Sequence, residues 1–310
     1  MKVLVTGASG FVGGALVRRL VEMELDVHVF IRGESDLWRI QDIQHKLASH
    51  VVDLRDAALV EQTVAGIRPA VIYHLATYGG FADQRDSSAI FAANFMGTVH
   101  LLRACENVDF DCFVNTGSSS EYGVKAVPMR ENDILEPVGD YGVAKSAATL
   151  FCRSEALQKD LPVVTLRLFS PYGPWDDPKR FVPYVIKSFL RGESPRLSTP
   201  DSVRDYIYID DVVDLYLKVS KAPPPSGGIF NVGSGEQSSL GEVVSLLGEM
   251  VGNGVVPAWG AITTKRDEPH SWVADMSGTR ELLGWEPSTP LKAGLRNTVE
   301  WFREHLDYYP

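Results

Sequence analysis

Cysteine is scarce in this chain of 310 residues, which contains only Cys105, Cys112 and Cys152. Three thiols cannot all pair with one another, and none of them stands in a Cys-x-x-Cys or other zinc-ligand spacing. We therefore expect neither a disulfide framework nor a metal centre. The cysteines are interpreted as unreactive thiols of a protein that works in the reducing cytoplasm.

The sequence also lacks a basic excess and a long apolar run. Its formal net charge is -10, and it has no cluster of positive charge of the kind that binds nucleic-acid phosphates. No apolar run approaches the roughly 20 residues that span a bilayer. Near the N-terminus, Gly7, Gly10, Gly13 and Gly14 interrupt any signal-peptide core. The sequence thus predicts a cytoplasmic protein that binds neither nucleic acid nor membrane.

Short β-rich runs alternate with helical patterns through the first half of the chain. Such alternation is typical of a parallel sheet with helices on both faces. The sequence therefore predicts an α/β fold with a Rossmann-type doubly wound parallel sheet in residues 1–168. The expected strands are 3–6, 27–31, 50–53, 70–76, 112–116 and 163–168.

Proline and glycine become frequent after Phe169, and the predicted elements become shorter. With 310 residues and 45% hydrophobic content, the chain is long enough for a second, smaller core. We expect a C-terminal α+β substrate-binding domain in residues 169–310, with possible return of a strand or helix to the first domain. Its expected helices are 180–191, 210–221, 239–251, 277–283 and 291–305.

The segment from Thr6 to Gly13 reads Thr-Gly-Ala-Ser-Gly-Phe-Val-Gly, follows the first strand and opens a helix. A pyrophosphate needs close backbone approach, free N–H groups and the positive end of a helix dipole, all of which such a turn offers. The alternative is a glycine-rich turn without a ligand. We assign cofactor contacts to Gly7, Ser9, Gly10, Phe11, Val12 and Gly13.

The end of the second strand should contact the adenosine ribose. Sites for NAD place an acidic residue there, whereas an arginine suits the 2′-phosphate of NADP. Here the chain has Arg32, followed by the hydroxyl of Ser35, and a carboxylate is missing at the strand end. We therefore expect NADP rather than NAD, the alternative being that Arg32 is a solvated loop cation.

Two further strand ends lie at the carboxyl edge, where open α/β sheets bind ligands. Asp53 can accept a hydrogen bond from the adenine amino group, and Leu54 follows it. At the end of the fourth strand we assign cofactor contacts to Leu75, Ala76 and Thr77. The preceding His74 is interpreted as a buried histidine with satisfied hydrogen bonds, and it receives no role.

Tyr141 directly precedes a predicted helix, 142–158, and Lys145 follows four residues later, a spacing that puts both side chains on one face of the helix. A neighbouring ammonium group favours the ionised form of a phenol, which suits acid–base chemistry. Upstream, residues 115–123 follow the fifth strand with a cluster of hydroxyl groups. The glycine turn, the hydroxyl cluster and the Tyr-x-x-x-Lys pair together predict an oxidoreductase.

In this order of motifs the chain resembles the extended short-chain dehydrogenase/reductase family, the NAD(P)-dependent epimerase/dehydratase group. The resemblance covers nearly the whole chain. It rests on Thr6 to Gly13, Asn94-Phe-Met-Gly-Thr98, Tyr141-x-x-x-Lys145, Tyr172-Gly-Pro174, Arg204 to Asp211 and Leu283-Gly-Trp-Glu-Pro287.

The resemblance implies a role for each catalytic residue. Ser118 would hydrogen-bond the reacting sugar oxygen, Tyr141 would transfer the proton, and Lys145 would hold the nicotinamide ribose. Arg204 and Arg266 would bind the substrate diphosphate, which suits planar cations with several donors. Further implied contacts are Thr116 and Phe169 with the cofactor, and Ser119, Ser120, Glu121, Asn94 and Ser170 with the substrate.

The resemblance, together with Arg32, leads to an expected reaction. Glu121 directly precedes Tyr122, whereas dehydratases of the family commonly have one residue between the acid and the tyrosine, so dehydration is disfavoured. Because ketoreductases consume NADPH, we expect reduction of a nucleotide-linked 4-keto-6-deoxy sugar at C4. A nucleotide-sugar 4-epimerase is the alternative, followed by a 4,6-dehydratase or a non-catalytic NADP-binding protein.

Family members pair through two helices, and we expect a homodimer here as well. The corresponding segments are 86–106 and 142–158, which carry more apolar residues than packing on the sheet should need. The alternative is that these residues all belong to the core of one chain. They are Ile90, Phe91, Phe95, Val99, Leu102, Ala144, Ala147, Ala148 and Phe151.

Overall fold

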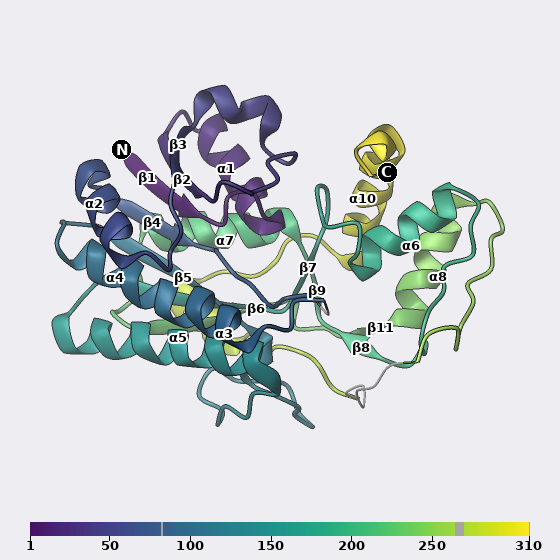
Figure 1. The fold of residues 1–310 in the computed structure, drawn as a ribbon. Coiled ribbons are helices and arrows are strands. Elements are labelled where there is room, and N and C mark those ends of the chain that lie inside the picture. Colours follow the sequence, from purple (N-terminus) through teal and green to yellow (C-terminus); the bar gives the residue numbers. More distant parts are fainter. Residues whose placement is uncertain (82, 264–269, 310) are drawn as a thin grey trace.

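The computed structural model describes residues 1–81, 83–263 and 270–309, which are arranged around a seven-stranded sheet (Figure 1). All neighbouring strands of this sheet run parallel, in the order β10-β6-β5-β4-β1-β2-β3. The expected doubly wound α/β fold is thus confirmed. The strands are β1 (Lys2–Thr6), β2 (Asp26–Ile31), β3 (Ala48–Val51), β4 (Val71–His74), β5 (Cys112–Ser118), β6 (Val163–Leu168) and β10 (Gly228–Val232).

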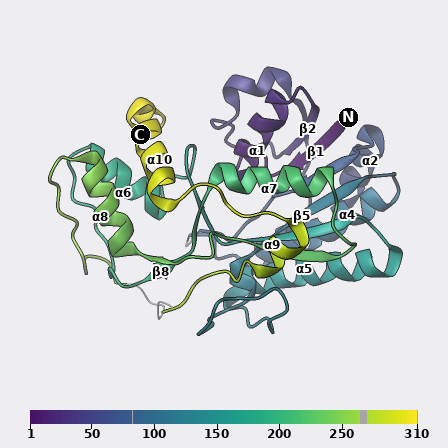
Figure 2. The same cartoon turned by 180° about the vertical axis from the view of Figure 1, so that it is seen from behind.

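Helices cover both faces of the sheet. On one face lie α2 (Ala57–Ile67), α4 (Gly97–Glu106) and α5 (Gly139–Lys159). On the other lie α1 (Phe11–Glu22) and α7 (Ile209–Lys221), which Figure 2 shows from behind. Two apolar cores result, because each strand contributes side chains to both faces.

The helix expected over 86–106 is divided into three parts. It begins as α3 (Ser87–Phe91), passes through a π-helical turn, η2 (Ala92–Met96), and continues as α4. Such a turn inserts one extra residue and rotates the side chains that follow it, and it is frequent at functional sites. Here it lies beside the loop that follows β4.

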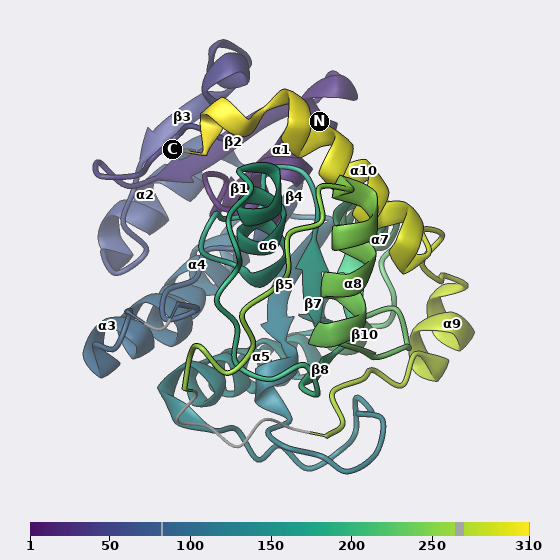
Figure 3. The same ribbon diagram turned by 90° about the vertical axis from the view of Figure 1, so that its right-hand side faces the viewer.

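Segments beyond residue 168 contribute to both layers. β10 is a strand of the main sheet and α7 packs on one face of it. In contrast, α6 (Phe181–Leu190), α8 (Leu240–Val251) and α10 (Leu291–Glu304) pack together beside the sheet (Figure 3). Two small sheets connect the parts, one formed by β7 (Ser170–Tyr172) with β9 (Tyr206–Tyr208) and one by β8 (Val203–Arg204) with β11 (Ser238–Ser239). The remaining helical elements are α9 (Ser277–Leu283), η1 (Gln41–Lys46), η3 (Ser119–Glu121) and η4 (Leu306–Tyr308).

The strand order reverses between β1 and β4. The chain runs outward from β1 through β2 to β3, and then returns to β4 and continues in the other direction. Ligands of open α/β sheets bind outside the carboxyl ends of the strands at such a point. Within the described ranges, no helix combines the length and the apolar character that crossing a membrane requires.

Candidate active site

The glycine turn after β1 packs directly against the end of β4. Gly7 has a φ of +73°, and a Cβ there would lie 2.6 Å from the backbone nitrogen of Ala76. A Cβ on Gly13 would lie 2.1 Å from the carbonyl oxygen of Gly7. Side chains are therefore excluded at both positions, and the turn keeps the close backbone approach that a pyrophosphate needs.

The N-terminus of α1 offers its first amide groups at this turn. Gly10 precedes the helix and has no side chain that could cap it, while Phe11 and Val12 begin the helix. Uncapped N–H groups and the positive end of the dipole suit a phosphate. The turn thus fits the diphosphate of a dinucleotide, with Gly7, Gly10 and Gly13 as its cradle.

A chain of hydrogen bonds joins the ends of β1 and β4. His74 Nδ1 lies 2.7 Å from Thr6 Oγ1, and His74 Nε2 lies 2.8 Å from Thr98 Oγ1. Because Thr98 donates its own proton to the carbonyl oxygen of Asn94, the Nε2 of His74 is the donor to Thr98. Thr6 Oγ1 also accepts from the backbone N–H of Ala76 at 3.2 Å. Burial, together with the charge of Lys145, lowers the pKa of His74 to about 3, so the ring is neutral. His74 is the satisfied buried residue that the sequence suggested.

The amide of Asn94 holds the loop after β4. Its Oδ1 accepts from the backbone N–H of Tyr78 at 2.8 Å and from Thr77 Oγ1 at 3.1 Å, and its Nδ2 donates to the carbonyl of Tyr78 at 2.6 Å. The π-helical turn directs this side chain inward, where it is 1% exposed. Asn94, which we expected at the substrate, instead fixes the loop that carries Thr77.

Arg32 directly follows the end of β2. The backbone N–H of Arg32 donates to Ser35 Oγ at 2.9 Å, and Arg32 Nε lies 3.4 Å from Glu34 Oε1. The Arg32 side chain is about half exposed, with 49% of its area accessible. Ser35 therefore caps the turn that presents the guanidinium, which retains room for an anion.

The carboxylate of Asp53 already has a partner. Arg55 Nε donates to Asp53 Oδ1 at 3.0 Å and to Oδ2 at 2.9 Å. These hydrogen bonds hold the pKa of Asp53 below its usual range. An adenine amino group at Asp53 would have to share it with Arg55. The next residue, Leu54, is buried, and its carbonyl oxygen lies 2.8 Å from His100 Nδ1.

Lys145 and Tyr141 lie one turn apart on α5, against the end of β5. The ammonium group of Lys145, which is 4% exposed, donates to the carbonyl of Thr116 at 2.6 Å. The hydroxyl of Thr116 is in turn 2.7 Å from the hydroxyl of Tyr216 on α7. Tyr141 is half-buried at the same end of the sheet.

A glycine that the sequence interpretation missed brings α5 to the hydroxyl cluster. A Cβ on Gly142 would lie 2.7 Å from the carbonyl oxygen of Ser120. Any larger residue would therefore push Tyr141 away from η3, the short helix that contains Ser119 and Ser120. The signal was available in the sequence, because a glycine stands directly after the tyrosine of the Tyr-x-x-x-Lys pair.

Ser118 ends β5 and caps η3. Its Oγ accepts from the backbone N–H of Ser120 at 3.1 Å, which leaves its own proton for another acceptor. The backbone N–H of Ser118 donates to Glu121 Oε1 at 2.8 Å, completing a capping box. This arrangement orients the Ser118 hydroxyl at the carboxyl edge of the sheet.

Glu121, which we expected at the substrate, lies in the interior with no exposed area. Its Oε2 accepts from Arg167 Nε at 2.7 Å, and its Oε1 also accepts from Thr149 Oγ1 at 3.0 Å. Burial raises the pKa of Glu121, and the nearby Arg167 guanidinium opposes that rise. A Cβ on Gly117 would lie 2.6 Å from Glu121 Oε1, so this glycine makes room for the pair. The physical reason for the correction is that Arg167 on β6 needs a buried counter-charge.

The second part of the chain places Ser170 on β7 and Arg204 on β8, in two different small sheets. The backbone N–H of Phe169 donates to Val232, and that of Ser170 donates to the carbonyl of Asp205, each at 3.0 Å. The guanidinium carbon of Arg204 lies 5.8 Å from the centre of the Trp272 ring. Arg266 lies outside the described residues.

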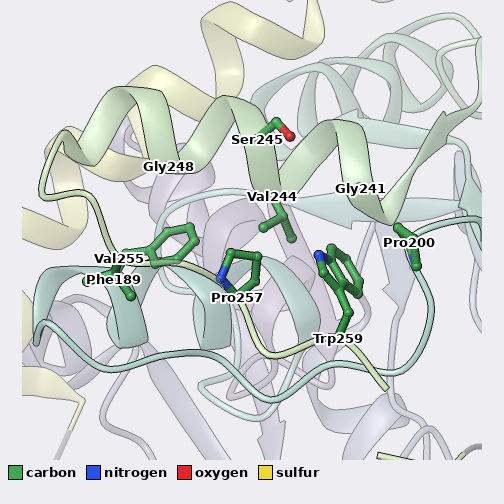
Figure 4. Close-up of a pocket in the computed structure, with 9 residues that line it drawn as sticks. All are labelled: Phe189, Pro200, Gly241, Val244, Ser245, Gly248, Val255, Pro257 and Trp259. Carbon is green, nitrogen blue, oxygen red and sulfur yellow. The ribbon is translucent and has the colours of Figure 1, made fainter. Parts of the chain in front are cut away.

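A separate groove of about 340 Å³ lies along α8, against the segment that carries Val255, Pro257 and Trp259 (Figure 4). Phe189, Val244 and Trp259 are among its largest lining side chains. It contains none of the residues that the sequence assigned to a site, so we place no chemistry there.

Comparison with known proteins shows similarity over almost the whole chain. Residues 3–233 match the NAD dependent epimerase/dehydratase family. The UDP-glucose 4-epimerase of Mycolicibacterium smegmatis is 30% identical, over 98% of this chain and 99% of that protein.

Two solved structures are similar throughout. The UDP-glucose 4-epimerase of Thermotoga maritima with UDP-glucose is 27% identical, with a TM-score of 0.90 over 99% of this chain and 100% of that one. The UDP-glucuronic acid 4-epimerase of Bacillus cereus, in complex with UDP-glucuronic acid and NAD, is 26% identical, with a TM-score of 0.88 over 98% of this chain and 100% of that one.

Proposed function

We propose, from the premise that the chain belongs to the NAD dependent epimerase/dehydratase family, that it is a nucleotide-sugar 4-epimerase. Family membership confirms the resemblance to extended short-chain dehydrogenases/reductases and identifies the chain as an enzyme of that group. The 4-epimerases among its relatives support the alternative that the sequence left open more than they support the expected ketoreductase.

The buried Glu121–Arg167 pair argues against elimination of water as the reaction. Elimination of water needs an acid that can protonate a leaving hydroxyl group. Glu121 is the carboxylate beside the hydroxyl cluster, and it is inaccessible and paired with Arg167 at 2.7 Å. The adjacent positions carry Ser119 and Ser120, which can hydrogen-bond a sugar but supply no comparable acid. Oxidation and reduction at C4 without elimination therefore fit this site best.

Three residues of this chain, Tyr141, Ser118 and Lys145, act at C4 of the sugar. A pyridine nucleotide held at the glycine turn and by Lys145 would supply reversible hydride transfer at C4 of the sugar, with no net change of the cofactor. Tyr141 takes the proton of the 4-hydroxyl group and gives it back in the second half of the cycle. Ser118 donates a hydrogen bond to the same oxygen, and Lys145 binds the nicotinamide ribose beside Tyr141.

Arg32 supports a second candidate, the NADPH-dependent reduction of a nucleotide-linked 4-keto-6-deoxy sugar at C4. Its guanidinium stands where an NAD site would have a carboxylate. Glu34 Oε1 lies 3.4 Å from Arg32 Nε. We propose that Arg32 and Ser35 donate hydrogen bonds to the 2′-phosphate of NADP and that NADP binds more tightly than NAD. An epimerase uses no net cofactor, so this preference does not by itself decide between the reactions.

The remaining assignments concern the substrate and the cell. Ser119, Ser120 and Ser170 are proposed to contact the sugar, and Arg204 with Arg266 to bind the diphosphate. Substrate would therefore enter between the sheet edge and the small sheets. The three cysteines are buried and unpaired, which supports a cytoplasmic location.

We also propose a homodimer, which pairs through exposed residues of α5 other than those that the sequence suggested. Of the residues cited for it, Ile90, Val99, Leu102, Ala144 and Ala148 are buried within one chain. An exposed stripe instead runs along α5 at seven-residue spacing: Val143 is 40% exposed, Leu150 54% and Leu157 62%. A stripe of this spacing is typical of helix pairing.

The deciding experiment follows both sugar and cofactor. Purified protein is incubated with UDP-glucose or UDP-glucuronic acid and catalytic NAD or NADP, and the products are separated by chromatography. The proposal expects the 4-epimer to accumulate to equilibrium without net change in absorbance at the NAD(P)H band. Net loss of NADPH with a nucleotide-linked 4-keto-6-deoxy sugar, and no isomerisation, would replace it by the reductase. Tyr141→Phe serves as the inactive control.

A further inference from the structure

Arg39 is an arginine of the loop after β2 whose guanidinium is almost completely buried, with the residue 7% exposed. It contacts two backbone carbonyls that are far apart in the sequence. Its Nε donates to the carbonyl of Trp175 at 2.7 Å, and one terminal nitrogen donates to the carbonyl of Ser9 at 3.2 Å. The other terminal nitrogen lies 3.4 Å from Asp177 Oδ2. A buried cation with these partners has a fixed position.

The Ser9 end of this bridge belongs to the glycine turn. Ser9 stands between Gly7 and Gly10, whose backbones form the cradle for the diphosphate. The Arg39 side chain also lines the first turn of α1, because a Cβ on Gly14 would lie 3.4 Å from Arg39 Cβ. Arg39 therefore supports the cradle through the turn's own backbone.

The Trp175 end belongs to a set of aromatic side chains at the C-terminus. We define the C-terminal clasp as Trp38, Trp175, Trp301, Tyr308 and Tyr309. The ring centre of Trp175 lies 5.0 Å from that of Trp301 and 5.4 Å from that of Tyr308. The ring centre of Trp38 lies 5.3 Å from that of Tyr309. Figure 3 shows α10 crossing towards α1 and β2, in agreement with these contacts.

The clasp also holds the backbone of Trp175 in an unusual conformation. Its φ is +66°, a left-handed value that residues other than glycine rarely adopt. Such a conformation persists only where the surroundings hold it. Here Tyr309 donates to the carbonyl of the next residue, Asp176, at 3.1 Å. The carbonyl that Arg39 uses is thus aimed by the C-terminal segment.

We propose that Arg39 is a positioning residue that ties the C-terminal clasp to the diphosphate cradle and so slows cofactor release. The inference rests on the proposed function only in that a pyridine nucleotide binds at the glycine turn. Slow release would matter for an epimerase, because the cofactor that takes the hydride would have to stay bound until the hydride is returned. Loss of the cofactor at that point would leave the sugar oxidised.

The test measures cofactor release from the full chain. Native protein, Arg39→Met and Arg18→Met are loaded with NAD or NADP, and the dissociation rate is followed by competition. Arg18 is the matched control, because its guanidinium lies 4.2 Å above the Trp175 ring and donates to the carbonyl of Arg39 at 2.6 Å. It contacts the clasp and Arg39, whereas no contact joins it to the described turn at Ser9.

We expect Arg39→Met to release cofactor at least about tenfold faster, because the glycine turn loses the charge-assisted hydrogen bond that Arg39 donates to the Ser9 carbonyl. Arg18→Met should stay within about twofold of the native rate, and binding of UDP should be unchanged in both. Native-like release from Arg39→Met, or equal acceleration in both variants, would overturn the inference. Failure of the native protein to epimerise would overturn the proposed function alone, because release is measured without turnover.

Arg39→Lys keeps the inference testable if the methionine variant does not fold. An ammonium group lacks the planar fork with which Arg39 contacts both carbonyls, so a partial effect of several-fold is expected. Release at the native rate from a folded lysine variant would show that the two-carbonyl bridge has no part in retention.

Discussion

The ammonium group of Lys145 donates a 2.6 Å hydrogen bond to the carbonyl of Thr116, joining α5 to the end of β5. This bond is local to the site but spans 29 residues of sequence. Its consequence is that Tyr141, one turn earlier on α5, lies at the carboxyl edge of the sheet with the hydroxyl cluster. The position of the proposed acid–base residue is thus defined by the backbone of the sheet.

Tyr141→Phe should remove nearly all turnover, because only the proton-transferring hydroxyl group is lost. General acid–base residues typically contribute about 10²- to 10⁴-fold. Cofactor affinity should be nearly unchanged, as measured by titration. Tyr73→Phe is the control, since it removes a buried hydroxyl that contacts Ser220 at 2.6 Å on another part of the sheet. A loss of less than tenfold in Tyr141→Phe would contradict the assignment.

Glu121→Gln should destabilise the protein by about 3–5 kcal/mol, the typical cost of leaving one member of a buried ion pair without its partner. The physical reason is that Arg167, 1% exposed, would keep its charge without a counter-charge. Urea unfolding measures the change. Glu136→Gln, which removes one member of the exposed pair with Lys125, should have little effect. Native stability of Glu121→Gln together with lost turnover would instead indicate a catalytic carboxylate.

Asp176 predicts a pH-dependent stability. Burial raises its pKa to about 6, from a usual value of about 3.9, although Arg180 opposes the rise. A carboxyl group with a raised pKa stabilises the folded state when protonated, so this contribution is complete below pH 4 and is lost as the pH rises through 6. Its size is on the order of 3 kcal/mol.

Asp176→Asn should therefore be more stable than the native protein at pH 7.5, with a difference that shrinks towards pH 4. The asparagine keeps an acceptor for the backbone N–H of Asp177, which donates to Asp176 Oδ1 at 2.8 Å. Thermal unfolding at both pH values measures the effect. A variant less stable than native at pH 7.5 would show that the Arg180 contact outweighs the cost of burying the charge.

Leu150→Glu tests the proposed dimer. It places a charge in the middle of the exposed stripe on α5, where pairing would bury it, so the protein should become monomeric. Val127→Glu is the control, because Val127 is similarly exposed, at 63%, but lies in the loop that precedes α5 and is not part of the stripe. Light scattering at micromolar concentration gives the mass. A native monomer, or a dimer that survives Leu150→Glu, would contradict the proposal.

The features that the sequence predicted correctly depend on short-range patterns. Six of the seven strands of the main sheet follow from apolar runs between helical patterns, and the glycine turn follows from spacing alone. Tyr141 and Lys145 could be paired because four residues make one turn of a helix. In each case the physical cause lies within a few residues of its effect.

The features that the sequence missed depend on partners far along the chain. Glu121 is buried because Arg167 is 46 residues away in sequence and adjacent in space. The seventh strand, β10, lies about 60 residues after its neighbour β6, beyond the reach of local alternation. Arg39 resembles any loop arginine until the fold brings it to Ser9 and Trp175. Tertiary packing decides such pairings, and one sequence does not reveal them.

Arg32→Asp tests which cofactor the site prefers. In the native protein NADP should bind more tightly than NAD, because the guanidinium can donate charge-assisted hydrogen bonds to the 2′-phosphate. Such a bond is worth about 1.5–3 kcal/mol. Glu34, 3.4 Å from Arg32 Nε, competes for the same cation, so we expect a preference of about tenfold, at the low end of that range.

The substitution should erase or reverse this preference, since it removes a cation and places a carboxylate beside a dianionic phosphate. NAD binding should suffer little, because an aspartate there can accept hydrogen bonds from the ribose hydroxyls. Glu34→Gln is the complementary variant: removing the competing carboxylate should strengthen NADP binding and leave NAD binding nearly constant. Calorimetric titration of both cofactors into the three proteins measures all of this. Equal affinities in the native protein, unchanged in Glu34→Gln, would mean that Arg32 does not contact the 2′-phosphate, and the argument for a consumable reductant would then fail while that for the epimerase would not.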